Sequence, residues 1–176
     1  MDKKDSVKRA RENNGQVKKE RGEQTNMERE IDAKGNKEKE TLRIELESLS
    51  KNEEFARVAV AVFMSRLNPT MEEIDDVKTA VSEAVTNAVI HGYQGKEGII
   101  YIEVIVMGQE LTVIVKDTGV GIVDIRKAME PMFTTDRTGE RSGMGFSFME
   151  AFMDNVQVIS APNEGTKVIM NKRIGR

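Results

Sequence analysis

The sequence predicts an α+β domain in which one mixed or antiparallel sheet carries its helices on one face. Two long segments in the first half of that domain have helical spacing and helix-capping residues. Strand-like segments precede and follow them, and the later strands come in adjacent pairs instead of alternating with helices. This order is typical of an α+β protein and not of a βαβ series.

The first 40 residues differ in composition from the rest of the chain. Residues 1–40 contain no aromatic residue and only scattered apolar residues among mixed charges. Such a segment cannot bury enough apolar surface to offset the entropy lost on ordering. We therefore expect residues 1–40 to be a disordered charged extension and residues 41–176 to form the domain.

The domain begins with a strand and a helix. Apolar and polar residues alternate over 41–49, which is the period of a half-buried strand. Asn52 is expected to cap the helix that follows, and Glu53 and Arg57 are expected on its outer face. The apolar residues expected to face the core are Phe55, Val58, Val62 and Leu67.

The second helix starts with a capping box, Thr70 to Glu73, and extends to about Gly92. Glu83 and Asn87 lie beyond one edge of its apolar stripe. Ala80 and Ala84 lie between stripe and pair, where small side chains would let a ligand approach the helix. The predicted core stripe contains Ile74, Val77, Val81, Val85 and Ala88.

The rest of the chain has the pattern of two strand pairs separated by a polar segment and a helix. Its expected elements are strands at 99–107 and 111–116 joined by a tight turn, a short helix at 124–129, a polar cover at 131–142, a helix at 145–154, and strands at 156–160 and 166–170.

Composition excludes several kinds of function. The 176 residues include no cysteine and one histidine, so disulfides, thiolate metal sites and sites needing two histidines are ruled out. The chain has no apolar stretch of membrane-spanning length and no secretory signal, which predicts a cytoplasmic protein without membrane contact. The predicted domain is mildly acidic, which argues against direct nucleic-acid binding.

Glu83 and Asn87 are the most informative pair, because residues four apart lie on one face of a helix. There a carboxylate able to accept a proton lies beside an amide oxygen able to hold Mg²⁺. Two glycine-bearing segments, 117–121 and 141–145, follow downstream. Each feature alone is more often an ordinary turn, cap or solvated pair. Together, in this order, they indicate a nucleotide site.

These motifs resemble the GHKL ATPase superfamily, whose Bergerat fold binds Mg²⁺-ATP against one face of a sheet. Its N box matches 83–87, its glycine boxes match 117–121 and 141–145, and Gly165–Thr166 matches its last nucleotide-contacting motif. The strings at 52–58, 82–93, 133–135 and 140–146 are similar to the small anti-sigma factor kinases of spore-forming bacteria, and most similar to their sporulation branch.

The resemblance implies a role for each matching residue. Glu83 would be the general base toward a substrate serine, Asn87 would coordinate Mg²⁺, and Asp117 would bind the adenine amino group. Glu53 and Arg57 would contact protein partners. The residues implied to bind ATP or ADP are Asn87, Asp117, Gly119, Gly121, Arg141, Ser142, Gly143, Met144, Gly145 and Thr166.

The same resemblance implies an anti-sigma factor that inhibits a sporulation sigma factor of the sigma F type. It would also be a protein-serine kinase that phosphorylates and inactivates a small STAS-type anti-anti-sigma factor, and it would form a homodimer. Two alternatives remain open at this point. One is the anti-sigma B type of stress-response kinase, and the other is a nucleotide-gated sigma-binding module without significant kinase activity.

Overall fold

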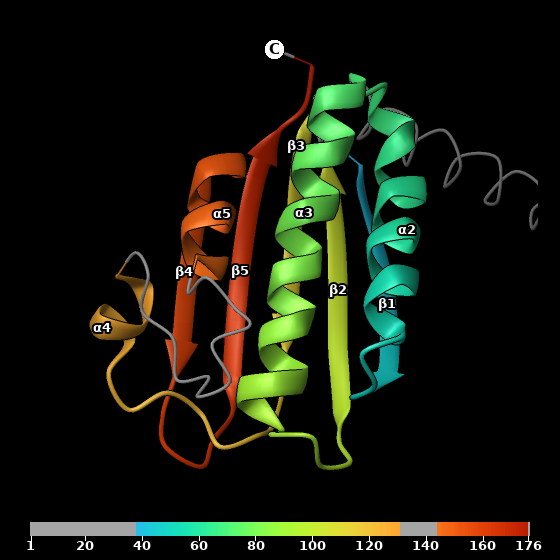
Figure 1. Cartoon of the computed structure of the whole chain (residues 1–176). Coiled ribbons are helices and arrows are strands. Elements are labelled where there is room, and N and C mark those ends of the chain that lie inside the picture. Colours follow the sequence, from blue (N-terminus) through green and yellow to red (C-terminus); the bar gives the residue numbers. More distant parts are fainter. Residues whose placement is uncertain (1–37, 131–143, 176) are drawn as a thin grey trace, which may run out of the picture. The chain divides into compact units, whose positions relative to one another are not determined.

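The computed structural model describes residues 38–130 and 144–175, and its centre is one five-stranded sheet (Figure 1). The strand order is β1-β2-β3-β5-β4, and every neighbouring pair is antiparallel. This confirms the predicted α+β class and the antiparallel alternative for the sheet. The strands are β1 (Lys39–Glu47), β2 (Ile99–Met107), β3 (Glu110–Lys116), β4 (Asn155–Ser160) and β5 (Thr166–Arg173).

Three helices cover one face of the sheet, as predicted (Figure 1). They are α2 (Asn52–Met64), α3 (Met71–Asn87) and α5 (Gly145–Phe152), while the short α4 (Ile125–Met129) follows β3. The capping box of α3 is present, because Thr70 Oγ1 accepts from the Glu73 N–H and the Glu73 carboxylate accepts from the Thr70 N–H. The capping residues predicted from sequence therefore do set where α3 begins.

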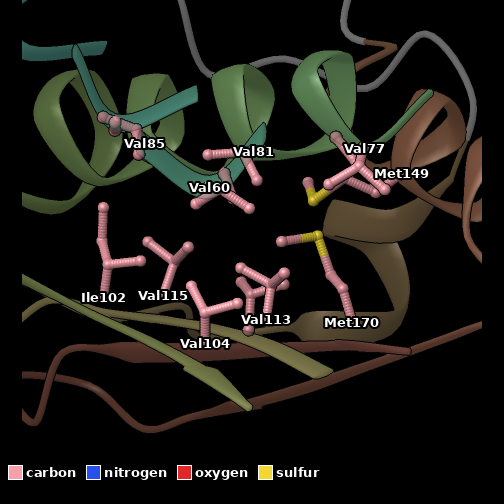
Figure 2. Close-up of a cluster of buried hydrophobic side chains, with 14 of the residues drawn as sticks. Val60, Val77, Val81, Val85, Ile102, Val104, Val113, Val115, Met149 and Met170 are labelled. Atoms are coloured by element: carbon pink, nitrogen blue, oxygen red, sulfur yellow. The ribbon is translucent and has the colours of Figure 1, made fainter. Parts of the chain in front are cut away.

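The core lies between the sheet and these helices (Figure 2). Alternate residues of β2 and β3 point toward the helices, as the period of two requires. Val77, Val81 and Val85 of α3 point toward the side chains of β2 and β3. Met149 of α5 lies next to Met170 of β5 (Figure 2). The predicted stripe of α3 is therefore its core face.

The predicted core face is wrong within α2, although Leu67, in the turn that follows the helix, is buried as expected. Phe55, Val58 and Val62 are 57%, 47% and 68% exposed. Ala56, Val60 and Met64 are fully buried in their place. Helix α2 has apolar residues on nearly every side, so periodicity alone does not identify the packed face, and small Ala56 permits a close approach to α3. Asn52 is also the first helical residue and not the cap, and its side-chain amide donates to the Glu47 carbonyl.

Helix α3 ends differently from the prediction. It is α-helical to Asn87 and then widens into a π-turn at Ala88–Gly92, where the Tyr93 N–H donates to the Ala88 carbonyl at 2.9 Å. Such π-turns are frequent at functional sites. Ala80 and Ala84 are 0% and 2% exposed, so they belong to the core and do not leave the open edge that was expected.

Two predicted segments lie largely outside the described residues. Residues Lys39–Arg176 form one compact unit, and the expected extension at 1–40 overlaps the described part only at its last three positions. The polar cover expected at 131–142 is not among the described residues. Within residues 38–130 and 144–175, no helix is long and apolar enough to span a bilayer.

Candidate nucleotide site

The structure brings the N-box pair against the start of α5. Glu83 and Asn87 are half-buried on the last turns of α3. A Cβ atom built on Gly145 would lie 2.9 Å from Glu83 Oε2 and 3.3 Å from Asn87 Nδ2. A side chain at 145 would displace the Glu83 carboxylate, so glycine lets α5 start beside the pair without moving it. The helix N-terminus also adds partial positive charge there, which favours a phosphate.

Asp117 forms a second polar centre where β3 ends. Asp117 is 4% exposed, and its Oδ1 accepts from the Gly119 N–H at 2.8 Å and from the Thr166 N–H at 3.3 Å. Burial raises the pKa of the Asp117 carboxyl, and the hydrogen bonds from Gly119 and Thr166 act in the opposite direction. A buried acceptor held in one orientation is suited to reading a hydrogen-bond donor on a base.

The π-turn that follows α3 connects these two centres. Gly92 lies one π-turn beyond Asn87, and its carbonyl accepts from the Val120 N–H at 2.9 Å. A Cβ on Gly119 would lie 2.1 Å from that carbonyl oxygen, and one on Gly92 would lie 2.9 Å from Asp117 Cγ. Glycines therefore let the end of the N-box segment pack directly on the 117–121 loop.

The C-terminal strand pair closes the site behind Asp117. The Asp117 N–H donates to the Thr166 carbonyl at 2.9 Å, and Thr166 Oγ1 lies 3.0 Å from Ser160 Oγ. Gly121 has a φ of +70°, and a Cβ there would lie 2.0 Å from the Ala161 carbonyl oxygen. Gly119 and Gly121 are thus required by contacts within the protein as well as by any ligand.

Most of the predicted nucleotide-binding residues fall at one end of the fold. Asn87, Asp117, Gly119, Gly121, Gly145 and Thr166 are described, and Met144 immediately precedes α5. Arg141, Ser142 and Gly143 lie outside the described residues, so their placement stays a prediction.

The predicted partner-binding pair is placed apart from the glycine loops, on α2. Glu53 and Arg57 have side chains 25% and 37% exposed, so they are half-buried and not on the outermost face that was expected. Glu53 accepts a hydrogen bond from Ser82, the residue before Glu83. Arg57 Nε lies 3.6 Å from Glu53 Oε1.

Sequence reasoning assigned no role to two polar residues of this region. Ser82 joins α3 to Glu53, and the Tyr93 hydroxyl contacts Thr118 of the glycine loop. Both belong to the 82–93 string, but neither has a spacing that indicates its contact, because both bonds join segments more than 20 positions apart in sequence.

Comparison with known proteins identifies the family. The family described as the histidine kinase-like ATPase domain matches residues 46–172. The Anti-sigma F factor of Clostridium kluyveri is 57% identical over 132 residues, covering 75% of this chain and 93% of that protein. The Anti-sigma F factor of Clostridium acetobutylicum is 57% identical over 133 residues, covering 74% and 93%. This chain belongs to the anti-sigma F factor family of GHKL ATPases.

A solved structure agrees with this family's fold. The crystal structure of the RsbU and RsbW domains of a Mycobacterium tuberculosis protein superposes with a TM-score of 0.56 at 20% identity, over 78% of this chain and 32% of that one. At that identity the likeness concerns the fold alone. The expected Bergerat fold of the GHKL ATPases is confirmed.

Proposed function

We propose that this protein is a cytoplasmic anti-sigma factor that binds and inhibits a sporulation sigma factor of the sigma F type. We further propose that it is an ATP-dependent protein-serine kinase, which phosphorylates and thereby inactivates its STAS-type anti-anti-sigma factor. The observation that carries the kinase proposal is the placement of Glu83 and Asn87 against Gly145 at the start of α5. The family membership supports the sigma-factor proposal.

The residues present fit a Mg²⁺-nucleotide. Mg²⁺ is usually held by one or two protein oxygens together with substrate phosphates, so the Asn87 side chain can serve as the protein ligand. Gly145 lets the start of α5 lie beside Asn87, and the free N–H groups at a helix N-terminus attract phosphate. When bound, the nucleotide would supply the phosphoryl group, and Mg²⁺ would neutralise the charge on that group.

Glu83 is the proposed general base. Its carboxylate lies one helical turn before Asn87 and takes the proton of the substrate serine as the serine oxygen bonds to the γ-phosphorus and ADP leaves. Asp117 would accept a hydrogen bond from the adenine amino group of bound ATP or ADP, at the end of the site away from Glu83.

Glu53 and Arg57 are the proposed partner contacts. They are carried by α2, and Glu53 is bonded to Ser82, which directly precedes the proposed base. A partner that contacts Glu53 and Arg57 therefore lies close to the helix that carries Glu83. This closeness supports one surface for both the sigma factor and the kinase substrate.

Homodimerisation is proposed through the exposed apolar face of α2. Phe55, Val58 and Val62 form an exposed stripe there, and β1 is an edge strand of the described sheet. An apolar stripe next to an open strand edge is typical of a self-association surface. Val62→Lys should produce a monomer in analytical ultracentrifugation. Val123→Lys, at an 88% exposed valine before α4, is the matched control and should leave a dimer.

The decisive experiment mixes the purified full-length chain with γ-labelled ATP, Mg²⁺, a sigma F type factor and the candidate anti-anti-sigma protein. The expected result is phosphoserine on the anti-anti-sigma protein and capture of the sigma factor. Capture without any phosphoserine would instead support a nucleotide-gated binding module. Capture of a stress-response sigma factor in preference to the sporulation factor would support the anti-sigma B type.

Arg57→Ala tests the partner surface in the same mixture. An interface arginine of this kind often contributes enough that its loss weakens binding roughly tenfold or more. Alanine is preferable to a charge reversal, because a new carboxylate would lie beside Glu53. Arg173→Ala, at a side chain 55% exposed at the end of β5, is the matched control and should bind the sigma factor normally.

A further inference from the structure

The Tyr93 side chain is buried at the point where α3, β2 and the 117–121 loop meet. Tyr93 is 7% exposed, and its hydroxyl donates to the Ile99 carbonyl at the start of β2. The same oxygen accepts from the Thr118 N–H at 3.0 Å and lies 3.2 Å from Thr118 Oγ1. One hydroxyl thus joins the strand that follows it in sequence to a loop 25 positions away.

The surrounding backbone leaves room for this ring. A Cβ built on Gly98 would lie 2.1 Å from Tyr93 Cε1, so a side chain at 98 would displace the ring. Next to Tyr93, the Gly92 carbonyl accepts from the Val120 N–H at 2.9 Å. Residues 92 and 93 therefore hold the 118–120 backbone at two successive points.

This contact bears directly on the Asp117 carboxylate. Thr118 lies between Asp117 and Gly119, and the Gly119 N–H donates to Asp117 Oδ1 at 2.8 Å. From the other side, the Thr166 N–H reaches the same oxygen at 3.3 Å. Asp117 Oδ2 makes no hydrogen bond with any other described residue, so it is the oxygen left to meet a ligand. The direction in which Asp117 Oδ2 points therefore depends on the 118–120 backbone, which Tyr93 holds through the Thr118 N–H.

We propose that Tyr93 is a positioning residue for adenine recognition, which rests on the proposed nucleotide site. By fixing the Thr118 N–H, it sets the turn that aims Asp117 at the amino group of the base. It acts through Asp117 and touches neither the serine nor the transferred phosphate. Its loss should therefore weaken nucleotide binding and the preference for adenine, and should leave transfer at saturating ATP nearly unchanged.

The test compares Tyr93→Phe with wild type in the full-length chain. Phenylalanine keeps the ring that fills the space over Gly98 and removes only the hydroxyl. The readouts are the dissociation constants of ATP and of ITP, whose hypoxanthine base lacks the amino group, together with kcat toward the anti-anti-sigma protein. Tyr101→Phe is the matched control, because Tyr101 is the only other tyrosine in the sequence. Tyr101 is 39% exposed on the face of the sheet that the helices do not cover.

The expected result is an ATP affinity lowered roughly tenfold, as for a lost buried hydrogen bond, with a similar reduction in the ATP-over-ITP preference and kcat within about twofold. ATP and ITP affinities that fall equally, or an unchanged ATP affinity, would overturn the assignment. Wild-type protein that fails to bind ATP would refute the proposed function instead. Should Tyr93→Phe not fold, amide exchange in wild type decides, because rapid exchange of the Thr118 N–H overturns the proposal and strong protection supports it.

Discussion

The two polar centres of the site differ in how deeply their side chains are buried. At the Asp117 end, a nearly buried carboxylate is held by two backbone N–H groups, and the loop that carries it is bonded to Tyr93 and Gly92. At the other end, Glu83 and Asn87 are half-buried beside Gly145, and the predicted nucleotide-binding residues 141–143 lie outside the described part of the chain. A buried acceptor that two N–H groups hold in place suits recognition of a rigid base. A half-buried pair suits chemistry on a second protein that must reach it.

The largest expected effect separates these roles at Glu83. Glu83→Gln should lower serine phosphorylation by about 10² to 10⁴, because a positioned base contributes that much, while ATP affinity changes by less than about threefold. The measurement is single-turnover transfer from labelled ATP together with an ATP titration. Glu72→Gln, in the exposed first turn of the same helix, is the matched control and should transfer normally. Full activity in Glu83→Gln would remove Glu83 from the mechanism.

Asp117→Asn should have the opposite profile. The asparagine amide is a poorer acceptor for the adenine amino group than the carboxylate, and it can present its NH₂ donor instead. ATP affinity should therefore fall by roughly 10². The free protein should not be destabilised, because burial disfavours the charged carboxyl at neutral pH. Calorimetric titration with ATP and thermal unfolding check both statements. Asp75→Asn, at an exposed carboxylate of α3, serves as control. Unchanged ATP binding would dismantle the contrast.

Gly145→Ala tests whether the pair depends on close approach of α5. The new Cβ would lie 2.9 Å from Glu83 Oε2, so that carboxylate must shift. Because a misplacement of about 1 Å can cost about 10² in rate, a shift of a few tenths should reduce transfer roughly tenfold. Ser147→Ala in the same helix is the control. Transfer rates that are equal for the two variants would mean that the Glu83 position is not critical.

The smallest expected effect concerns the pH dependence of stability. The folded pKa of Asp117 is raised above its ordinary 3.8, so the stability it contributes is present below pH 3.8 and is lost as pH rises through the folded pKa. Asp117→Asn lacks this titration and should gain stability relative to wild type across that window. Denaturant unfolding at a series of pH values measures the difference. A difference that is constant, or that shrinks as pH rises, would contradict burial as the dominant cause.

Local sequence patterns predict several features of this fold. The capping box of Thr70 and Glu73, the core stripe of α3 and the adjacent strand pairs depend on neighbours in sequence, and they are confirmed. The packed face of α2 was predicted wrongly, because apolar residues on nearly every side make its periodicity ambiguous. The helix packs through Ala56 and Val60, and that choice depends on where α3 and the sheet lie.

The candidate site likewise has some features that local motifs predict and others that depend on contacts between distant segments. Motif spacing indicated Glu83, Asn87 and Asp117, whose roles stay proposals. It could not indicate that Tyr93 holds Thr118 or that Ser82 holds Glu53, because these contacts depend on how distant segments meet. The π-turn after Asn87 likewise has no simple sequence signature, although it sets where Gly92 and Tyr93 meet the glycine loop.

A crystal structure of the full-length chain with Mg²⁺ and a non-hydrolysable ATP analogue tests the central claim most directly. It should show the adenine amino group within hydrogen-bond distance of Asp117, Mg²⁺ bound by the Asn87 side chain and the γ-phosphate next to Glu83. A nucleotide whose base lies away from Asp117, or whose γ-phosphate is remote from Glu83, would contradict the division of the site into a base-recognition end and a phosphate-transfer end.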